Sequence, residues 1–300
     1  MKSHIQEKIK HYQKQHQNRA RLLINCPDQP GIVAAVSEFL YQNKANIIES
    51  NQYSTDPSGG NFFLRIEFDC PDLAANKDKL EADFESIAQK FEMDWKFTYV
   101  FEVKKLAIFV SKELHCLQEL LWEWQSGDLM ADISLVISNH EDARATVEML
   151  GIPFYYIPAN KDIRKEVEEQ QLKLLEEYEV DRIVLARYMQ ILTPDFVAQH
   201  PNRIINIHHS FLPAFIGAKP YERAYKRGVK LIGATSHFVT NDLDEGPIIE
   251  QDISRVNHRD NAEDMKKIGQ SVERSVLARA LKWEIDDRVI VHQNKTIVFS

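Results

Sequence analysis

Between Arg21 and Val103, segments with the apolar pattern of a strand alternate with segments whose apolar residues recur at helical spacing. Runs of strand length lie at 21–26, 46–54, 62–70 and 94–103, whereas 33–42 and 73–91 carry apolar residues at helical spacing. The order strand, helix, strand, strand, helix, strand predicts a ferredoxin-like βαββαβ unit.

From Lys104 onward the pattern changes to continuous apolar runs. These lie at 105–110, 133–139, 152–158, 182–187, 203–209 and 231–239, with helical stretches expected at 112–125, 141–149, 161–179 and 218–227. Buried strands that alternate with helices predict a doubly wound, mostly parallel sheet. A short hairpin around 293–295 is expected near the end of the chain. We therefore predict an α/β and α+β protein with two domains, 20–103 and 104–300.

The first 19 residues are polar and basic. Ile5, Ile9 and Tyr12 lie at helical spacing, so a short amphipathic helix could form, but we expect a frayed or loosely docked tail. The segment has no apolar stretch of the kind found in secretory signals.

Composition narrows the class of partners. The 300 residues carry a net charge of −8, which argues against nucleic acid or an anionic membrane as partner. No apolar run approaches the roughly 20 residues that span a bilayer. Three scattered cysteines suit a reducing, cytoplasmic setting and are too few for a disulfide framework or a zinc site.

The glycine-rich loops that hold phosphates are absent. The loop after the first apolar run of the second domain, SKELHC at 111–116, has no glycine. Backbone amides approach a phosphate closely where glycine is present, so this loop argues against a phosphorylated substrate there.

Polar residues follow a buried strand in the segment NIHHSFLP, 206–213. Asn206 and His208 point to one face of the predicted strand because side chains alternate. Open α/β sheets bind ligands at this end of their strands, although a polar pair packed against a loop remains an alternative. A metal site at His208 and His209 is disfavoured, since neighbouring strand residues diverge.

The acidic link TNDLDEGPII, 240–249, supplies a third candidate, Asp244. Acidic loop residues are usually solvated, but we expect this link to close the same end of the sheet as Asn206 and His208. Together these residues would provide an oxyanion donor, a proton carrier and a carboxylate that orients the histidine. Those are the roles that acyl chemistry without a metal requires.

Longer segments resemble a known family. VSKELHCLQELL, LARYMQIL, NIHHSFLPAF and GATSHFVTNDLDEGPII resemble the folate-dependent formyltransferase fold family, and most closely its deformylases. CPDQPGIVAAVSEFL and NKANIIESNQYS resemble the ACT-type regulatory domain found in front of those deformylases. Together the two resemblances span nearly the whole chain from residue 20.

The resemblance implies roles for individual residues. Asn206, His208 and Asp244 match the family's catalytic residues, and His209 could shape the water site or simply pack at the strand end. Residues that match the folate pocket are Met189, Ile191, Leu192, Val239 and Asp242. Arg187, Lys219 and Arg223 could meet the glutamate tail of a folate or could be solvated.

The implied reaction is hydrolysis of 10-formyltetrahydrofolate to formate and tetrahydrofolate, without metal or cofactor. It would supply formate and balance one-carbon folate pools for purine biosynthesis. The glycine-free loop, together with His209 and Phe211, departs from the formyltransferases and favours water as acceptor. A formyltransferase with an amine acceptor is the alternative, and a non-catalytic sensor is a third hypothesis.

The ACT resemblance implies amino-acid control. Asp28 and Gly31 lie at a strand–helix corner, where backbone amides suit a carboxylate ligand, and Asn46 matches a position that often contacts the bound amino acid. Glycine and methionine are the candidate effectors, and ACT units commonly pair, so we expect a homo-oligomer. An ACT unit that only dimerises is the alternative.

Overall fold

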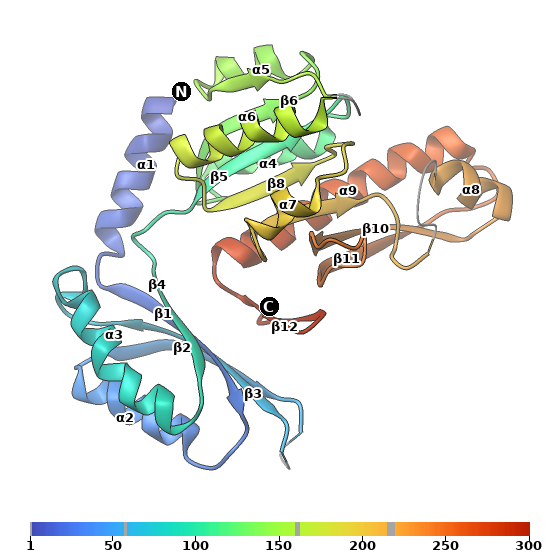
Figure 1. Cartoon of the computed structure of the whole chain (residues 1–300). Coiled ribbons are helices and arrows are strands. Elements are labelled where there is room, and N and C mark those ends of the chain that lie inside the picture. Colours follow the sequence, from blue (N-terminus) through green and yellow to red (C-terminus); the bar gives the residue numbers. More distant parts are fainter. Residues whose placement is uncertain (1, 57–58, 160–162, 215–219) are drawn as a thin grey trace. The chain divides into compact units, whose positions relative to one another are not determined.

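The computed structural model describes residues 2–56, 59–159, 163–214 and 220–300. They form two compact units (Figure 1). The smaller unit contains 7–103 together with 286–290 and 297–300, and the larger contains 104–285 and 291–296 with the residues before Glu7. The last residues of the chain are therefore divided between the two units, and the expected boundaries of 20–103 and 104–300 omit this division.

The smaller unit is an antiparallel sheet with two helices. Its strands pair in the order β2-β3-β1-β4. Its core contains Phe39, Phe84 and Phe97, whose rings make edge contacts at centroid distances of 5.0 and 5.6 Å. This arrangement confirms the predicted βαββαβ order. The elements are β1 (Arg19–Pro27), α2 (Ile32–Gln42), β2 (Asn46–Ser54), β3 (Asn61–Asp69), α3 (Leu73–Lys90) and β4 (Asp94–Tyr99).

The N-terminal segment is a helix, α1 (Lys2–Gln15). Ile5 is buried, and Gln13 Nε2 donates a hydrogen bond to the Phe101 carbonyl oxygen at 3.0 Å. The expectation of a frayed tail was wrong, because the segment is helical, one of its apolar side chains is buried and one polar side chain is hydrogen-bonded.

A buried ionic network lies within the smaller unit. The Arg65 side chain is fully buried, 2.7 Å from Glu49 and 2.9 Å from Glu67. Arg21 contacts Glu67 at 3.0 Å and Asp287 at 3.1 Å. Buried charges require such partners, so Asp287, from the end of the chain, is an integral part of this unit.

The larger unit is built on a seven-stranded sheet in the order β11-β10-β9-β8-β5-β6-β7. Strands β5 to β9 are parallel, whereas β10 runs antiparallel to both β9 and β11. The mostly parallel sheet is thus confirmed. The strands are β5 (Lys105–Val110), β6 (Asp132–Ser138), β7 (Phe154–Tyr156), β8 (Arg182–Ala186), β9 (Ile204–His208), β10 (Leu231–Phe238) and β11 (Ile248–Arg255).

Helices connect these strands. They are α4 (His115–Ser126), α5 (Arg144–Met149), α6 (Arg164–Glu177), α7 (Pro194–Ala198), α8 (Pro220–Arg227) and α9 (Ala262–Ile285), and the predicted final hairpin is β12 (Val289–His292) with β13 (Lys295–Val298). The sequence pattern missed α9, which has 24 residues. Glu273 and Glu284 are buried on it, and these charges interrupt the apolar stripe that would have revealed a packed helix. Among the described residues, no helix is long and apolar enough to cross a membrane.

Candidate active site

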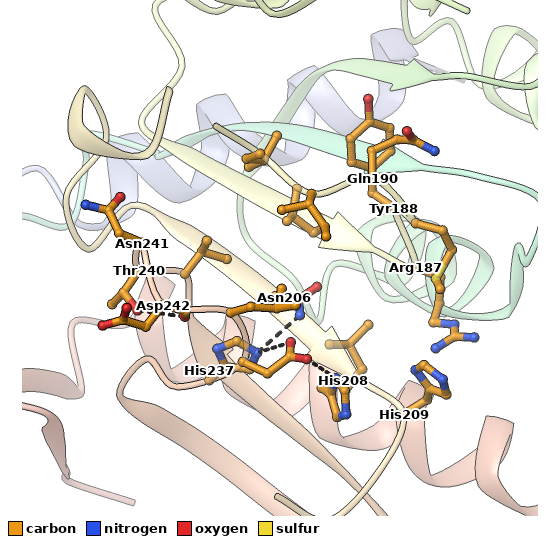
Figure 2. Close-up of a pocket in the computed structure, with 18 residues that line it drawn as sticks. Arg187, Tyr188, Gln190, Asn206, His208, His209, His237, Thr240, Asn241 and Asp242 are labelled. Atoms are coloured by element: carbon orange, nitrogen blue, oxygen red, sulfur yellow. Dashed lines mark hydrogen bonds and ion pairs between the residues drawn. The ribbon is translucent and has the colours of Figure 1, made fainter. Parts of the chain in front are cut away.

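The centre of the site is the face of β9 that carries Asn206 and His208 (Figure 2). Asn206 lies opposite His237 of β10, and its Nδ2 donates to His237 Nε2 at 3.1 Å. His237 Nδ1 is 2.9 Å from the Phe238 carbonyl oxygen, which assigns the proton to Nδ1 and makes Nε2 the acceptor. His237 therefore fixes the orientation of the Asn206 amide.

Sequence reasoning missed His237 as a site residue. Burial lowers its pKa, so it is neutral and able to accept this hydrogen bond. Its position in the segment GATSHFV was visible, but its register opposite Asn206 depends on β10 being antiparallel, which the pattern of apolar runs did not reveal.

Asp244 reaches the site from a loop that starts at the opposite end of β9. Val239 N donates to the Ile204 carbonyl oxygen at 2.9 Å, beside the first residue of β9. The link therefore begins near the amino end of β9, not at the carboxyl end of the parallel strands, but it still brings Asp244 to His208 as expected. It returns to place Asp244 Oδ2 3.3 Å from His208 Nδ1 and Oδ1 3.8 Å from His237 Nε2.

The loop needs two special backbone features. Asp244 has a left-handed conformation with φ of 59°, which aspartate tolerates better than most residues. A Cβ on Gly246 would lie 1.8 Å from the Phe238 carbonyl oxygen. The D-x-G spacing of this link is therefore a requirement of the turn that carries Asp244.

The electrostatics favour an ionised Asp244 beside His208. Burial raises the pKa of Asp244, but its hydrogen bond with His208 and the neighbouring histidines outweigh that effect, so the pKa is lowered. His208 is buried, and its Nε2 has no hydrogen-bond partner among the described residues. Asp244 thus holds one ring nitrogen and leaves the other for proton exchange.

A pocket of about 410 Å³ brings the predicted site residues together. Its wall includes the exposed apolar side chains of Met189 and Ile191 and the loop that contains Asp242. The predicted residues that line it are Asn206, His208, Asp244, His209, Met189, Ile191, Leu192, Val239 and Asp242. A polar end with Asn206 and His208 and a largely apolar wall are typical of a site for a conjugated organic ligand.

The glycine-free loop after β5 supports this wall. Ser111 Oγ accepts from Met189 N at 3.1 Å and donates to Asn139 Oδ1 at 2.7 Å. Directly after Leu192, the last residue of this wall segment, Thr193 N donates a hydrogen bond to Glu168 at 2.8 Å. These contacts hold the segment around Met189 in place.

Carboxylates also gather around the start of α4. Glu113 contacts Lys266 at 2.6 Å and Gln270 at 2.9 Å, and His115 Nε2 is 2.7 Å from Glu273. These contacts join the segment at the start of α4 to α9.

His209 lies next to His208, with ring centroids 5.2 Å apart. The expectation that the two side chains diverge was wrong, because β9 ends at His208 and His209 no longer follows the strand alternation. Burial and the charge of Arg187 lower the pKa of His209 to about 4. His209 is therefore neutral at pH 7.

One group of three possible metal ligands is present among the described residues: His115, Cys116 and Glu273. Burial raises the pKa of the Cys116 thiol, and the Arg187 guanidinium lies 3.3 Å from Glu273. A protonated thiol and an adjacent cation make this group a poor cation site.

The structure does not bring the three predicted effector residues together within one unit. Asp28 follows the end of β1, and Gly31 precedes α2 with a φ of 98°. Asn46 pairs with Asp69, at the end of the sheet where β1 begins. The length of β1 therefore separates Asn46 from Asp28, roughly 27 Å for nine residues.

The three basic residues considered as partners of a folate glutamate tail have different surroundings. Arg187 is 8% exposed and is ion-paired with Glu273, so it is not a solvated base. Arg223 lies on α8, and Lys219 lies outside the described residues.

The fold and site together define a formyl transferase-type unit joined to an ACT-type unit. The formyl transferase family model matches residues 104–281, and the ACT domain model matches 20–85. Both matches agree with the classes inferred from the sequence.

Relatives that match over the whole chain identify the family more closely. The chain is 69% identical over 300 residues to formyltetrahydrofolate deformylase of Bacillus subtilis, covering 100% of both. A crystal structure of a formyltetrahydrofolate deformylase from Pseudomonas syringae matches with a TM-score of 0.90 and 46% identity, over 97% of this chain and 99% of that one. The phosphoribosylglycinamide formyltransferase of Coxiella burnetii matches 66% of this chain and 94% of its own, with a TM-score of 0.61 and 30% identity. This chain belongs to the formyltetrahydrofolate deformylase family.

Proposed function

We propose that this chain hydrolyses 10-formyltetrahydrofolate to formate and tetrahydrofolate, using Asn206, His208 and Asp244 without a metal or cofactor. The observation that carries the proposal is their convergence at the polar end of one pocket: the Asn206 amide is oriented by His237, and Asp244 Oδ2 lies 3.3 Å from His208. The family membership supports the reaction, and the residue roles are part of the proposal.

In this mechanism water attacks the formyl carbon and negative charge develops on the formyl oxygen. Asn206 Nδ2 uses one hydrogen for His237 and offers the other to that oxygen. A positioned donor of this kind lowers the barrier by about 2.7–4 kcal/mol. His208 Nε2 donates a hydrogen bond to the same oxygen and then passes its proton to N10 as the C–N bond breaks. Such proton transfer contributes roughly 10²–10⁴-fold.

Asp244 has two roles. Its carboxylate lies 3.3 Å from His208 Nδ1 and so orients the imidazole ring, and it positions the attacking water. Met189, Ile191 and Leu192 cover the apolar part of the folate, while the backbone from Val239 to Asp242 meets the pterin ring. His209, neutral and adjacent to His208, shapes the water site.

Water is the proposed acceptor because the loop after β5 lacks the glycine that lets backbone amides approach a phosphate closely. The start of α4 has no glycine and carries Glu113 and His115, which hold Lys266 and Glu273. A formyltransferase that uses an amine remains the second candidate. The two differ in one simple observation: only the hydrolase releases formate when no amine is supplied.

Two variants test the assigned roles. Asp244→Asn and His208→Ala are expected to reduce formate release by at least about 100-fold while folate still binds, because the apolar wall is unchanged. Binding is measured by titration with a non-hydrolysable folate, and turnover by formate production. Near-normal turnover in either variant would refute its catalytic role, whereas loss of folate binding would show that the residue acts in recognition.

We further propose that the ACT unit binds an amino acid, glycine or methionine, in a homo-oligomer that works in the cytoplasm to supply formate for purine biosynthesis. Strand β2 is at the edge of its sheet and exposes Ile47, Ile48 and Tyr53, which suits pairing between copies. Asp28 and Asn46, distant within one chain, could then meet across the pair. Sedimentation and activity measurements with each amino acid test this; a monomer, or no response to either, would contradict it.

A further inference from the structure

Arg187 occupies an unusual position at the catalytic end of the pocket. It directly follows β8 with a left-handed φ of 64°, is 8% exposed and forms part of the pocket wall with His208 and His209. Figure 2 shows its guanidinium next to His209, on the side of His208 away from the Thr240–Asp242 loop. A buried cation is costly, so its retention here calls for a binding partner.

The partner within the chain satisfies Arg187 only in part. Its Nε is 3.3 Å from Glu273 Oε2, yet Nε and Nη1 are both buried without a hydrogen-bond partner among the described residues. The Glu273 oxygens instead accept from Tyr221 Oη at 2.6 Å and pair with His115 Nε2 at 2.7 Å. Unsatisfied buried donors cost about 1–3 kcal/mol each, so Glu273 compensates the Arg187 guanidinium incompletely.

The neighbours of Arg187 leave its charge available to a small anion. His209 is neutral at pH 7 because its pKa is lowered to about 4. Burial and Glu273 raise the pKa of Tyr221, and burial raises that of Cys116, so both stay protonated. Glu273 is the carboxylate paired with Arg187, and it already has two other partners.

We propose that Arg187 binds the carboxylate of formate as it is released, an inference that rests on the proposed deformylase function. In the reaction one water adds to the formyl carbon, the C–N10 bond breaks, N10 gains one proton, and the second proton of the water leaves as formic acid ionises. The resulting carboxylate is small, planar and anionic. A guanidinium matches this geometry with two parallel N–H donors, whereas neither the neutral formyl group nor water carries such a charge.

The test measures formate directly, without relying on turnover. ¹³C-labelled formate is titrated with the folded enzyme in the absence of folate, and binding is followed by the broadening of its NMR signal. Wild type is expected to bind formate, Arg187→Met to bind at least 10-fold more weakly, and Arg187→Lys to fall between them. Arg203→Met removes an exposed arginine outside the pocket and is expected to match wild type.

Kinetics separate this role from the alternatives. Formate is expected to inhibit wild-type hydrolysis, with an inhibition constant that rises at least 10-fold in Arg187→Met while the KM for folate changes less than 2-fold. Equal formate affinity in Arg187→Met and wild type, or a raised folate KM with unchanged formate inhibition, would overturn the proposal and favour a role in the folate tail. A third outcome is that formate binding depends on Arg187 but no formate is released from the folate when no amine is supplied. That result would uphold the carboxylate site and refute the proposed deformylase function.

Discussion

Replacing Gly246 by alanine tests whether the loop geometry controls catalysis. The added Cβ would lie 1.8 Å from the Phe238 carbonyl oxygen and 2.9 Å from its carbon. A carbon approaches such an oxygen to about 3.3 Å, so the turn must move by about 1.5 Å. Asp244 lies two residues earlier, and its 3.3 Å contact with His208 depends on that turn.

A misplacement of about 1 Å can lower a rate by 10²-fold. We therefore expect the kcat of Gly246→Ala to fall roughly 100-fold, with folate binding reduced less because Met189 and Ile191 belong to another segment. Formate release measures kcat, and thermal denaturation checks that the variant is folded.

Gly228→Ala is the matched control. Gly228 also has a positive φ, 69°, but a Cβ there would meet no atom within 4 Å. It shares the backbone strain without the steric clash, so its kcat should match wild type. A folded Gly246→Ala enzyme with normal kcat would refute the reasoning, since it would show that Asp244 does not depend on this turn.

Two further predictions concern stability. Glu67→Gln weakens the pairing of the buried Arg21 and Arg65, so we expect it to lower the free energy of unfolding, measured by urea titration, by about 3–5 kcal/mol. Glu263→Gln, at an exposed position, is the control and should have no measurable effect. Equal stabilities of Glu67→Gln and wild type would contradict the importance of the network. His209 has a folded-state pKa of about 4, below the unfolded value of about 6.5, so the unfolded chain binds the extra proton between these values. The free energy of unfolding should therefore fall as the pH falls from 6.5 to 4, and His209 contributes at most about 1.4 kcal/mol per pH unit to this fall. The fall should be less steep in His209→Asn. If stability depended on pH equally in the variant and in wild type, His209 would not be held neutral.

The sequence predicted most strands of both sheets because their apolar runs are long and regular, but it missed β11, in which Glu250, Gln251 and Asp252 interrupt the apolar pattern. It also singled out Asn206, His208 and Asp244, which the structure brings together in one pocket, since each belongs to a short motif with a chemical reason for its residue types; their catalytic roles stay a prediction. Other features depend on tertiary context. The buried Glu273 hides α9 from a hydrophobic pattern, and His237 becomes a site residue only because β10 runs antiparallel to β9.

The predicted effector residues also show what local sequence motifs cannot predict. Asp28, Gly31 and Asn46 each fit a local motif, yet β1 separates Asn46 from the other two. Local motifs do not specify which ends of a sheet meet. Arg187 was visible only as a basic residue, and its burial against Glu273 follows from the packing of α9.

The most direct test of the account is hydrolysis of 10-formyltetrahydrofolate in ¹⁸O-labelled water with no amine present. We predict that formate and tetrahydrofolate form in equal amounts, that each formate carries one oxygen from water, and that Asp244→Asn abolishes both products. Folate binding without formate release, or formate that lacks the label, would contradict the central claim that this site uses water as its acceptor.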